Sequence, residues 1–329
     1  MNKCERFIFL LMYIIVFIDS SIGMSPCVTV DGLDGNCVPL DSCNWILAKT
    51  TLMKDVISQS ECGMLPDFSP LVCCAKWRNA ENCGRLEHTS EIERFPWVVD
   101  VIYHRKRSFT QGCAGSLINS RFALTAAHCI SDLSFILTPY SIRVKKDYRT
   151  YQDYKILRSI IHPNYNKYSI NKEHDVALLK LTGKVTFDEY VQPICLPRKE
   201  DHDERSLSEG QLLTIFSKGP PVIGIVNRQK HAIAMKLRNS SVCDKIYKDV
   251  RIELKTSQIC VGGEPGKDSC PGDSGSPLMQ QIIDLVPLRW SQVGLVSLGP
   301  QKCGGKIPGI YVRLVDYIDW IEATVDHVD

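Results

Sequence analysis

Three short stretches of this sequence carry side chains that together could perform nucleophilic catalysis. Their central residues are His128 in Thr-Ala-Ala-His-Cys, Asp175 in His-Asp-Val-Ala-Leu-Leu, and Ser274 in Gly-Asp-Ser-Gly-Ser-Pro. A serine becomes a good nucleophile when a histidine accepts its proton and a carboxylate holds that histidine in the required tautomer. Each stretch alone also fits a structural role, as a core histidine or a turn aspartate. Together they predict acyl transfer through a Ser-His-Asp triad.

The order of the three residues along the chain narrows the kind of enzyme. His, Asp, Ser is the chymotrypsin-type order, and it differs from the orders in subtilisin and in α/β-hydrolases. The hydrolase elbow also requires glycine two residues after the serine, where this chain has Ser276. From about residue 86 onward the chain therefore resembles the S1 family of chymotrypsin-like serine proteases. The resemblance implies an all-β fold, a double β-barrel with a C-terminal helix.

The same resemblance implies roles for residues near the serine. Backbone N–H groups of Gly272 and Ser274 would form the oxyanion hole. Asp268, followed by Ser269, would be the charged floor of an S1 pocket that selects Arg or Lys. The alternative for Asp268 is a solvated loop acid. The other substrate-binding positions implied are Ser297, Gly299 and Gly309.

Activation is where the sequence departs from this family. Activated members begin with Ile-Val-Gly-Gly after a cleaved Arg or Lys, and the new amine inserts beside the aspartate that precedes the serine, here Asp273. The tetrapeptide does not occur in this sequence. Cleavage after Arg85 would make Leu86 the terminus, about two residues nearer to Pro96 than in the family, which removes up to roughly 7 Å of reach. Pro271, Leu298 and Phe216-Ser217-Lys218 also depart from the family pattern.

The elements that must hold these residues are visible as short apolar runs. Turn residues separate the runs, which is typical of strands, and a helical pattern follows at Val315, Ile318, Ile321 and Val325. This favours an all-β barrel or sandwich closed by a helix. The expected strands cover 97–103, 123–127, 176–181, 212–216 and 293–298.

Fifteen cysteines indicate an oxidising compartment. Residues 1–23 are interpreted as a signal peptide, because basic residues precede an apolar run over 7–18 and small residues follow. Its removal would take Cys4 away and leave fourteen cysteines, an even number. The alternative is an uncleaved anchor, but this run is too short to span a bilayer. The mature protein is expected to be secreted and extracellular.

Six of the remaining cysteines crowd residues 24–74, a stretch too small to hold itself together without covalent links. The pattern ends in adjacent Cys73 and Cys74 and resembles the clip domain of arthropod serine proteases. Zinc is the competing interpretation, but without CxxC pairs or nearby histidines the cysteines fit tetrahedral ligation poorly. The two resemblances imply seven disulfides: Cys27–Cys73, Cys37–Cys62, Cys43–Cys74, Cys83–Cys195, Cys113–Cys129, Cys243–Cys260 and Cys270–Cys303.

The expected organisation is a signal peptide over 1–23, a clip domain over 24–74, a linker and candidate activation region over 75–85, and a protease domain over 86–329. The net charge of +2 gives no strong field for nucleic acid or an anionic membrane, so neither is expected as a partner. Expected partners are protein substrates with Arg or Lys at the cleavage site, an upstream activating protease and serpin inhibitors. Neither a cofactor nor a metal is expected.

Two surface motifs remain. Asn239 begins Asn-Ser-Ser, an acceptor for N-glycosylation in a secreted protein. The basic run His104-Arg105-Lys106-Arg107 lies in an expected loop between Tyr103 and Cys113, and is either solvated or an exosite for an acidic protein partner.

The leading hypothesis is a secreted trypsin-like serine endopeptidase, made as a zymogen, that acts in an extracellular cascade of innate immunity or melanisation, or in venom. The alternative is a protease homologue that keeps the triad, cannot organise its oxyanion hole, and works as a regulatory cofactor or binding protein. The complete triad favours the enzyme, and the missing activation terminus favours the cofactor.

Overall fold

A computed structural model describes the chain over the following residues: 25–28, 34–40, 58, 60–66, 69–75, 83–86, 95–133, 137–146, 150–197, 207–217, 219, 231–282, 289–300 and 302–327. The chain divides into two compact units, residues 1–77 and 78–328. The expected signal peptide lies outside the described residues. Among the helices that are described, none has both the length and the apolar character needed to cross a membrane.

The first unit contains a four-stranded antiparallel sheet in the order β1-β2-β4-β3. Cys37 and Cys73 are buried and face each other in the register of β2 and β4, and β3 is exposed along its whole length. With so little buried apolar surface, covalent links supply stability that a larger core would otherwise give. The strands are β1 Pro26–Val28, β2 Asp34–Pro39, β3 Glu61–Met64 and β4 Pro70–Ala75.

The second unit begins with a closed six-stranded barrel in the order β10-β7-β6-β5-β8-β9. Closure pairs both edges of each strand, so no backbone edge is left open. Val, Ile and Leu side chains, among them Val99, Leu117 and Ile142, fill the interior. The strands are β5 Val98–Arg105, β6 Ser108–Leu117, β7 Phe122–Thr125, β8 Leu137–Lys145, β9 Tyr151–Ile161 and β10 Ala177–Leu181.

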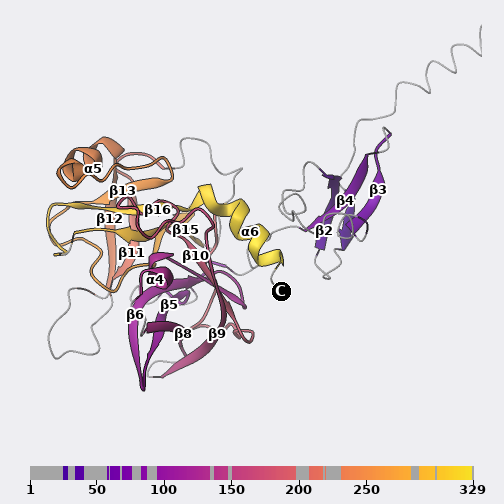
Figure 1. Cartoon of the computed structure of the whole chain (residues 1–329), viewed down its shortest axis with the longest axis horizontal. Helices are drawn as coiled ribbons and strands as arrows, with labels where there is room; N and C mark the ends of the chain where they lie inside the picture. The colour runs from indigo at the N-terminus through magenta and orange to yellow at the C-terminus, as the bar shows by residue number, and fades with distance from the viewer. Residues whose placement is uncertain are drawn as a thin grey trace, which may run out of the picture. The chain divides into compact units, whose positions relative to one another are not determined.

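A second closed barrel follows in the order β11-β12-β13-β16-β15-β14 (Figure 1). Its core contains Leu213, Ile215, Met235 and Leu278, all fully buried. The strands are β11 Leu212–Ser217, β12 His231–Arg238, β13 Gln258–Gly262, β14 Pro277–Ile282, β15 Arg289–Leu298 and β16 Pro308–Arg313. The two barrels confirm the predicted all-β fold and the five expected strands.

The described helices are short and lie at the edges of the barrels (Figure 1). The helical pattern predicted between Val315 and Val325 is confirmed, with a 3-10 turn that leads into α6. Two of its apolar residues, Ile318 and Ile321, are buried. The helices are α4 His128–Ser131, α5 Ser240–Tyr247, η2 Lys248–Val250, η3 Leu314–Tyr317 and α6 Ile318–His327.

Polar contacts join the two barrels at their junction. The indole Nε1 of Trp97, ahead of β5, donates to Sδ of Met279 on β14 at 3.0 Å. The buried Ser116 hydroxyl on β6 donates to Oε1 of Gln292 on β15 at 2.6 Å. Because buried polar groups need partners, these bonds fix how the barrels meet. In Figure 1, α4 lies between the barrels.

One expectation about the first barrel is wrong. The basic run between Tyr103 and Cys113 is not an expanded loop, because β5 and β6 continue as a paired ladder out to Arg105 and Ser108. Lys106 and Arg107 alone form the turn, with Lys106 at a φ of 51°. β5 is also paired with β8 as far as Arg105, so both neighbours of this strand hold it. The three cations therefore stand at the tip of a hairpin with a two-residue turn.

Candidate active site

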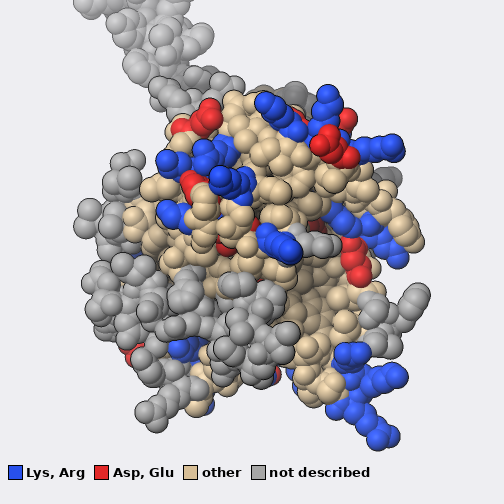
Figure 2. Space-filling view, turned by 90° about the vertical axis from the view of Figure 1, so that its left-hand side faces the viewer, with Lys and Arg blue, Asp and Glu red and all other residues tan. Residues whose placement is uncertain are grey.

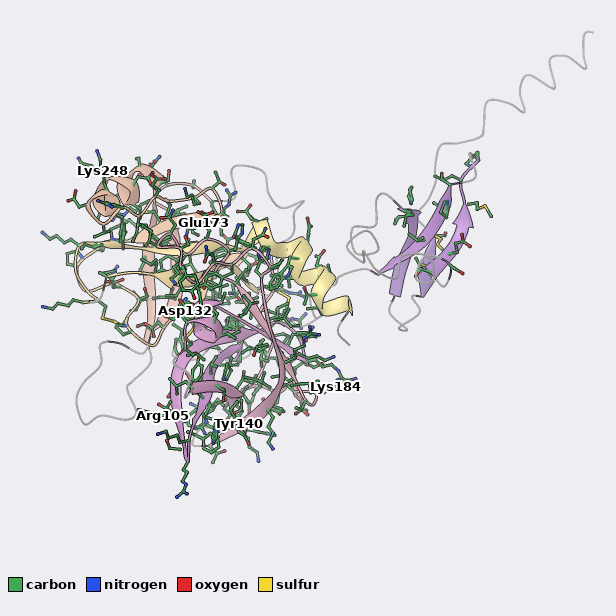
Figure 3. All side chains as sticks on the ribbon, viewed as in Figure 1. Arg105, Asp132, Tyr140, Glu173, Lys184 and Lys248 are labelled. Carbon is green, nitrogen blue, oxygen red and sulfur yellow. A yellow bond between two sulfur atoms is a disulfide. The ribbon has the colours of Figure 1, made fainter. Side chains whose placement is uncertain are left out.

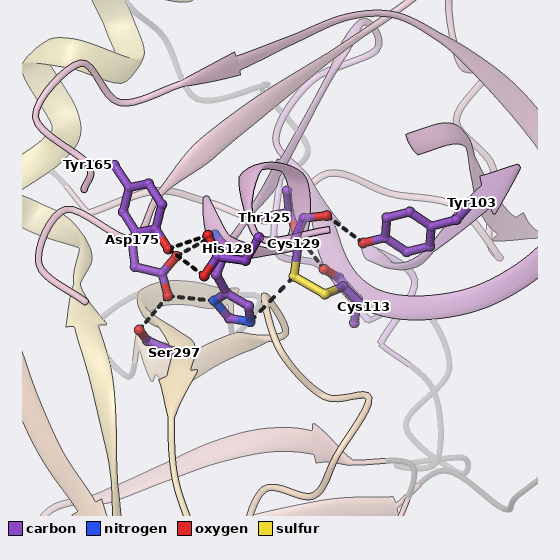
Figure 4. Close-up of a disulfide and its surroundings, with 10 residues drawn as sticks. Tyr103, Cys113, Thr125, His128, Cys129, Tyr165, Asp175 and Ser297 are labelled. Atoms are coloured by element: carbon purple, nitrogen blue, oxygen red, sulfur yellow. Dashed lines mark hydrogen bonds and ion pairs between the residues drawn. A yellow bond between two sulfur atoms is a disulfide. The ribbon is translucent and has the colours of Figure 1, made fainter. Parts of the chain in front are cut away.

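His128 is the first residue of α4, directly after the buried strand β7. The disulfide between Cys113 and Cys129 ties this helix to β6 (Figure 4). The hydroxyl of Tyr103 on β5 donates to the carbonyl of Cys129 at 2.9 Å. The backbone at His128 is therefore held by one covalent and one hydrogen bond from neighbouring strands.

Asp175 stands at the entrance to β10 and is fully buried. Its Oδ1 accepts the backbone N–H of His128 at 2.8 Å, and its Oδ2 lies 2.7 Å from Nδ1 of the same ring. The Ser297 hydroxyl donates to Oδ2 at 2.5 Å (Figure 4). Because Oδ2 accepts from Nδ1, the ring proton is held on Nδ1, which leaves Nε2 as the acceptor.

The residue before Asp175 is also fixed. His174 has a φ of 55°, an uncommon conformation for a residue other than glycine. Its Nδ1 lies 3.1 Å from the hydroxyl of Tyr317 in η3, and its ring stacks on His162 with centroids 5.0 Å apart. The C-terminal segment thus holds the turn that delivers Asp175 to His128.

The His128 ring is 21% exposed, and three neighbours act on its charge. Burial alone would lower the pKa of the imidazole. The charge and hydrogen bond of Asp175 outweigh burial and, with a smaller contribution from Asp132, place the pKa above its ordinary value of 6.5. Lys172 opposes this rise. The ring is thereby prepared to carry a proton.

Ser274 lies on the turn before β14, against the first barrel. Its carbonyl accepts the N–H of Ala114 on β6 at 2.8 Å, next to Cys113. The neighbouring Gly275 has a φ of 79°, and a Cβ there would come within 2.4 Å of both the Ala114 carbonyl and the Thr125 hydroxyl. Only glycine permits this approach.

Among the described residues, the Ser274 hydroxyl makes no hydrogen bond to His128. The Nε2 atom instead faces Sγ of Cys129 at 3.8 Å. Bonds between nucleophile and base are often long without substrate, so the arrangement is compatible with a triad that tightens on binding. The structure therefore joins two of the three predicted catalytic residues directly.

The loop before Ser274 is organised around a buried carboxylate. Asp273 is fully buried, and its Oδ2 accepts the backbone N–H of Cys270 at 2.7 Å and the Ser217 hydroxyl at 2.5 Å. The N–H of Gly219 in turn donates to the Ser217 oxygen at 3.0 Å. Gly272, the other expected oxyanion-hole residue, has a φ of 99°. In the sequence, Ser217 is visible only as a departure from the family pattern. The structure shows that it binds the carboxylate of Asp273.

Asp268 is 4% exposed, so it is not the solvated loop acid that was its alternative. Burial raises the pKa of its carboxyl above the ordinary value of 3.8, the N–H groups of Gly304 and Ser269 act against this, and the charge of Asp273 adds to it. The Gly304 N–H donates to Oδ2 at 3.0 Å. Within the described part of the chain, no lysine or arginine forms an ion pair with Asp268.

The other expected pocket residues differ in how they relate to this carboxylate. The hydroxyl of Tyr311 on β16 donates to that of Ser269 at 3.3 Å, and the disulfide between Cys270 and Cys303 closes the loop. A Cβ at Gly299 would lie 3.9 Å from the Ser269 oxygen, so this glycine borders the same space. Gly309 is on β16, where a Cβ would meet the Tyr311 ring at 3.0 Å. The hydroxyl of Ser297, expected to pair with substrate, is bound to Asp175, so only its backbone is left for that role.

A charged cluster beside His128 was not anticipated from the sequence. Lys172 donates to Oδ2 of Asp132 at 2.5 Å and to the carbonyl of Lys167 at 2.8 Å. The Tyr165 hydroxyl donates to the same Asp132 carboxylate at 3.2 Å. Lys172 also contacts that hydroxyl at 3.3 Å. No local motif marks this cluster, because its members come from separate loops.

The candidate activation region is partly described. The N–H of Gly84 donates to the carbonyl of Pro193, and its carbonyl accepts the N–H of Trp290, both at 2.8 Å. The disulfide between Cys83 and Cys195 anchors the same point. Arg85 and Leu86 follow it, half-buried, and Nε of Arg85 is buried without a hydrogen-bond partner among the described groups. Residues 87–94 lie outside the described part.

Six of the seven expected disulfides are present, and the seventh, Cys43–Cys74, involves Cys43, which lies outside the described residues. Cys113, His128 and Cys129 place three potential metal ligands within 4.8 Å of one another. Because the two sulfurs are joined to each other, no thiolate is left to bind a metal. Asn239, the candidate glycosylation site, is exposed and caps α5 by accepting the Ser241 N–H at 3.0 Å.

Known proteins share both parts of this chain. Residues 86–321 match the trypsin family, and residues 27–74 match the regulatory CLIP domain of proteinases. The chain is 30% identical to CLIP domain-containing serine protease B15 of Anopheles gambiae, over 91% of this chain and 90% of that protein. It is also 30% identical to phenoloxidase-activating factor 1 of Holotrichia diomphalia, over 96% and 98%.

A solved structure agrees with these matches. The Drosophila Grass clip serine protease of the Toll pathway superposes with a TM-score of 0.64 at 25% identity, covering 92% of this chain and 98% of that one. The match to the trypsin family begins at Leu86, the residue after the candidate cleavage bond. The chain is thus a member of the trypsin family of serine proteases, and of its insect branch that carries a CLIP domain.

Proposed function

We propose that this protein is a secreted, trypsin-like endopeptidase made as a zymogen. The observation that carries the proposal is the pair formed by His128 and the fully buried Asp175, with Nδ1 and Oδ2 2.7 Å apart. Such a pair is suited to accept and return the proton of a nucleophile. The proposal includes the domain boundaries 24–74 for the clip domain, 75–85 for the linker and 86–329 for the protease.

The reaction begins at Ser274. Its hydroxyl attacks the carbonyl carbon of the scissile peptide bond, and Nε2 of His128 takes the proton. The imidazolium that forms is stabilised by Asp175, whose charge already raises the pKa of the ring. His128 then donates the proton to the leaving amine, which departs and leaves an acyl-enzyme. Water, activated by the same ring, hydrolyses the ester and restores the serine.

Negative charge develops on the substrate carbonyl oxygen during attack. The N–H groups of Gly272 and Ser274 are the proposed donors to it. The positive φ of Gly272 supports this role, because only glycine adopts it without strain and the backbone can then approach the oxygen closely. Loss of one such donor typically costs about 2.7 to 4 kcal/mol in barrier height.

Specificity for Arg or Lys rests on Asp268. A buried carboxylate without a cationic partner is costly, and burial here already raises its pKa. A guanidinium or ammonium from the substrate would supply the missing counter-charge through charge-assisted hydrogen bonds. Phe or Leu at the same position would leave the carboxylate buried and unpaired.

Activation is proposed to follow cleavage after Arg85. The disulfide between Cys83 and Cys195 would keep the clip domain attached after the cut. In the uncut chain, Ser217 and the backbone of Cys270 donate to Asp273, and this arrangement is proposed to be that of the inactive precursor. The amine of Leu86 would have to compete with the Ser217 hydroxyl for Oδ2.

The relatives supply the biological setting of the proposal. One is named a phenoloxidase-activating factor, and another is a clip protease of the Toll pathway. We infer that this protein acts in an extracellular cascade of the same kind, in innate immunity or melanisation. Its partners would be protein substrates with Arg or Lys at the cut, an activating protease and serpins.

A second candidate function is a catalytically impaired homologue that acts as a regulatory cofactor. Two observations favour it: the chain has Leu86 where the family has Ile-Val-Gly-Gly, and Asp273 is already bonded to Ser217. If the new terminus cannot displace Ser217, the oxyanion loop stays in its precursor arrangement.

Labelling with a fluorophosphonate separates the two candidates. The reagent needs both an activated Ser274 and a formed oxyanion hole, so the endopeptidase should react slowly when uncut and rapidly after limited cleavage at Arg85. Arg85→Gln is the matched control, because it removes the cut and leaves the site unchanged. No labelling in the cut protein, with the cut verified by mass, would favour the cofactor.

A further inference from the structure

The first barrel carries a surface on which cations gather around exposed aromatic and apolar side chains. We name it the hairpin surface. It comprises the β5–β6 tip and the neighbouring part of the outer face of β9, and its main members are Arg105, Lys106, Arg107, Phe109, Tyr140, Lys155 and Leu157.

Charge is unevenly distributed along this chain. The segments 104–107 and 143–158 together hold nine Lys or Arg and two Asp, an excess of seven, whereas the whole chain has a net charge of +2. The remainder therefore carries an acidic excess of five. On the face seen in Figure 2, the group of Lys and Arg at the lower right has no Asp or Glu beside it. At the upper end both kinds are interspersed.

The cations at the tip form no ion pair with any residue in the described part of the chain. Arg105, Lys106 and Arg107 are all exposed, and no described carboxylate forms an ion pair with them. Arg143, by contrast, is bound by both oxygens of Asp153, at 2.6 and 2.8 Å. The tip therefore offers charges without an internal partner, on a backbone that strand pairing holds in place.

Strand pairing brings the aromatic residues beside this tip. Phe109 is opposite His104 in the β5–β6 ladder, and its ring lies 4.9 Å from that of Tyr140 on β8. Lys155 on β9 lies 5.8 Å from the centre of the Tyr140 ring. Figure 3 shows Arg105 and Tyr140 at the same end of the barrel.

The exposed apolar residues argue against a merely solvated charged face. Phe109 is 57% exposed and Leu157 is 62% exposed. A solvated basic face gains nothing from exposing such side chains. Exposed aromatic residues beside arginines are instead the composition enriched at the centre of protein interfaces.

The geometry points to the hairpin surface as a docking site for an acidic segment of a protein partner, one that carries an aromatic or aliphatic side chain among its carboxylates. The carboxylates would pair with the tip, and the apolar side chain would cover Phe109 and Leu157. A sulfated polysaccharide would match the charge but would leave the apolar residues exposed, so the peptide is favoured. β6 also runs from this tip to Cys113, which is five residues or roughly 17 Å from Ser108. Cys113 is bonded to Cys129, the neighbour of the catalytic His128.

The test measures binding and requires no catalysis, so its failure would leave the proposed endopeptidase unaffected. The protein is full-length Ser274→Ala, and the probe is a fluorescein-labelled peptide of Glu, Asp, Phe and Tyr without basic residues. The charge variant is Arg105→Glu, Lys106→Glu and Arg107→Glu combined. Its matched control is Lys245→Glu, Lys248→Glu and Arg251→Glu, which changes the net charge equally at α5, on the other barrel, where Asp244, Asp249 and Glu253 balance the cations.

Fluorescence anisotropy should show at least a roughly tenfold loss of affinity in the charge variant and little change in the control. Phe109→Ser should weaken binding while leaving its salt dependence unchanged, because it removes area and no charge. If the hairpin variant and the α5 control lost affinity equally, binding would depend only on the net charge of the protein, and the proposal would be overturned. The proposal would also be overturned if a peptide with Ser in place of Phe and Tyr bound as tightly as the probe. Binding of heparin without binding of the peptide would overturn it as well.

Circular dichroism verifies that each variant folds. If the triple variant does not, Lys106→Glu alone and a salt titration of the unmodified protein serve the same purpose. Affinity that is independent of salt between low and physiological ionic strength would exclude a charged dock.

Discussion

The two barrels contribute unequal halves of the site. In the first barrel, the base and its carboxylate are fixed by short bonds, with the Asp175 carboxylate accepting from three donors and the Cys113–Cys129 disulfide beside His128. In the second barrel, Ser274 has no hydrogen bond to the base, and the loop before it is held through Asp273 by a hydroxyl and by backbone. The His128–Asp175 half is complete within the fold. The arrangement of the Ser274 half depends on which group binds the carboxylate of Asp273.

This difference shows where regulation can act. A change in the His128–Asp175 pair would disturb barrel packing, because both residues are anchored to core strands. Exchanging the partner of Asp273 would move only a glycine-rich turn, in which Gly272 and Gly275 both have positive φ. Cleavage can therefore regulate the Ser274 loop with little change to the rest of the fold, whereas regulation through the His128–Asp175 pair would disturb the first barrel.

Ser274→Ala should have the largest effect on activity, a loss of about a millionfold in kcat, because covalent catalysis ends when the nucleophile is removed. The half-buried hydroxyl makes no hydrogen bond among the described groups, so the melting temperature should change little. Hydrolysis of an Arg peptide ester by cleaved protein measures the loss. Residual turnover above about one thousandth of the unmodified rate would mean that another residue is the nucleophile.

Asp175→Asn tests the completed half and should lower kcat/KM by about ten thousandfold, because the amide favours the wrong imidazole tautomer. It should also move the acid limb of the pH profile. Catalysis needs neutral His128, and its raised pKa puts the limb above pH 6.5 in the unmodified protein. Without the Asp175 charge, burial dominates, the pKa falls and the limb moves to lower pH.

Ser297→Ala is the matched control, since it keeps the carboxylate and should shift the limb less. A limb that stays in place in Asp175→Asn would show that Asp175 does not set the charge of His128.

The sequence predicted the fold and the positions of the main site residues because those signals are local. Apolar runs mark the strands, and short motifs surround His128, Asp175 and Ser274. The bonds that organise the site join residues that are distant in the sequence, with a separation of 122 for Ser297 and Asp175 and of 56 for Ser217 and Asp273. No spacing rule along one chain relates such pairs.

The turn at Lys106 also depends on residues that are distant in the sequence. A run of four basic or titratable residues is typical of a loop, so the hairpin at Lys106 was not expected. The cross-strand pairing of Arg105 with Ser108 depends on neighbours in β8 that are about thirty positions away. Long-range pairing outweighed the local propensity for a loop.

Asp268→Ser tests the pocket floor. It should lower the preference for Arg over Phe at the cleavage site by at least about a thousandfold, because the new pocket has no charge to leave unpaired. Parallel kcat/KM values for Arg and Phe peptide substrates measure the preference. Glu264→Gln is the control. It removes a carboxylate that lies four residues before Asp268 and is paired with Arg238, and it should leave the preference for Arg over Phe intact. A preference for Phe in the unmodified protein would contradict the assignment.

Ser217→Ala should have the smallest effect, and it acts on the incomplete half alone. If Ser217 competes with the Leu86 amine for Asp273, removing its hydroxyl should raise the activity of protein cut after Arg85 by about tenfold, the equivalent of one hydrogen bond to a charged group. Ser217→Thr keeps a hydroxyl and should behave like the unmodified protein. The rate of fluorophosphonate labelling reports the change without depending on substrate affinity.

The direction of that change decides between two roles of the same bond. An increase means that the hydroxyl holds the precursor arrangement and that the amine is the activating partner. A fall in activity in both cut and uncut protein would mean that Ser217 itself supports the active loop, so that the missing Ile-Val-Gly-Gly is replaced from within the fold. That second result would contradict the zymogen proposal, because the uncut chain would then need no new terminus. Since the bond is buried, the effect should persist at high salt, which separates it from a surface charge effect.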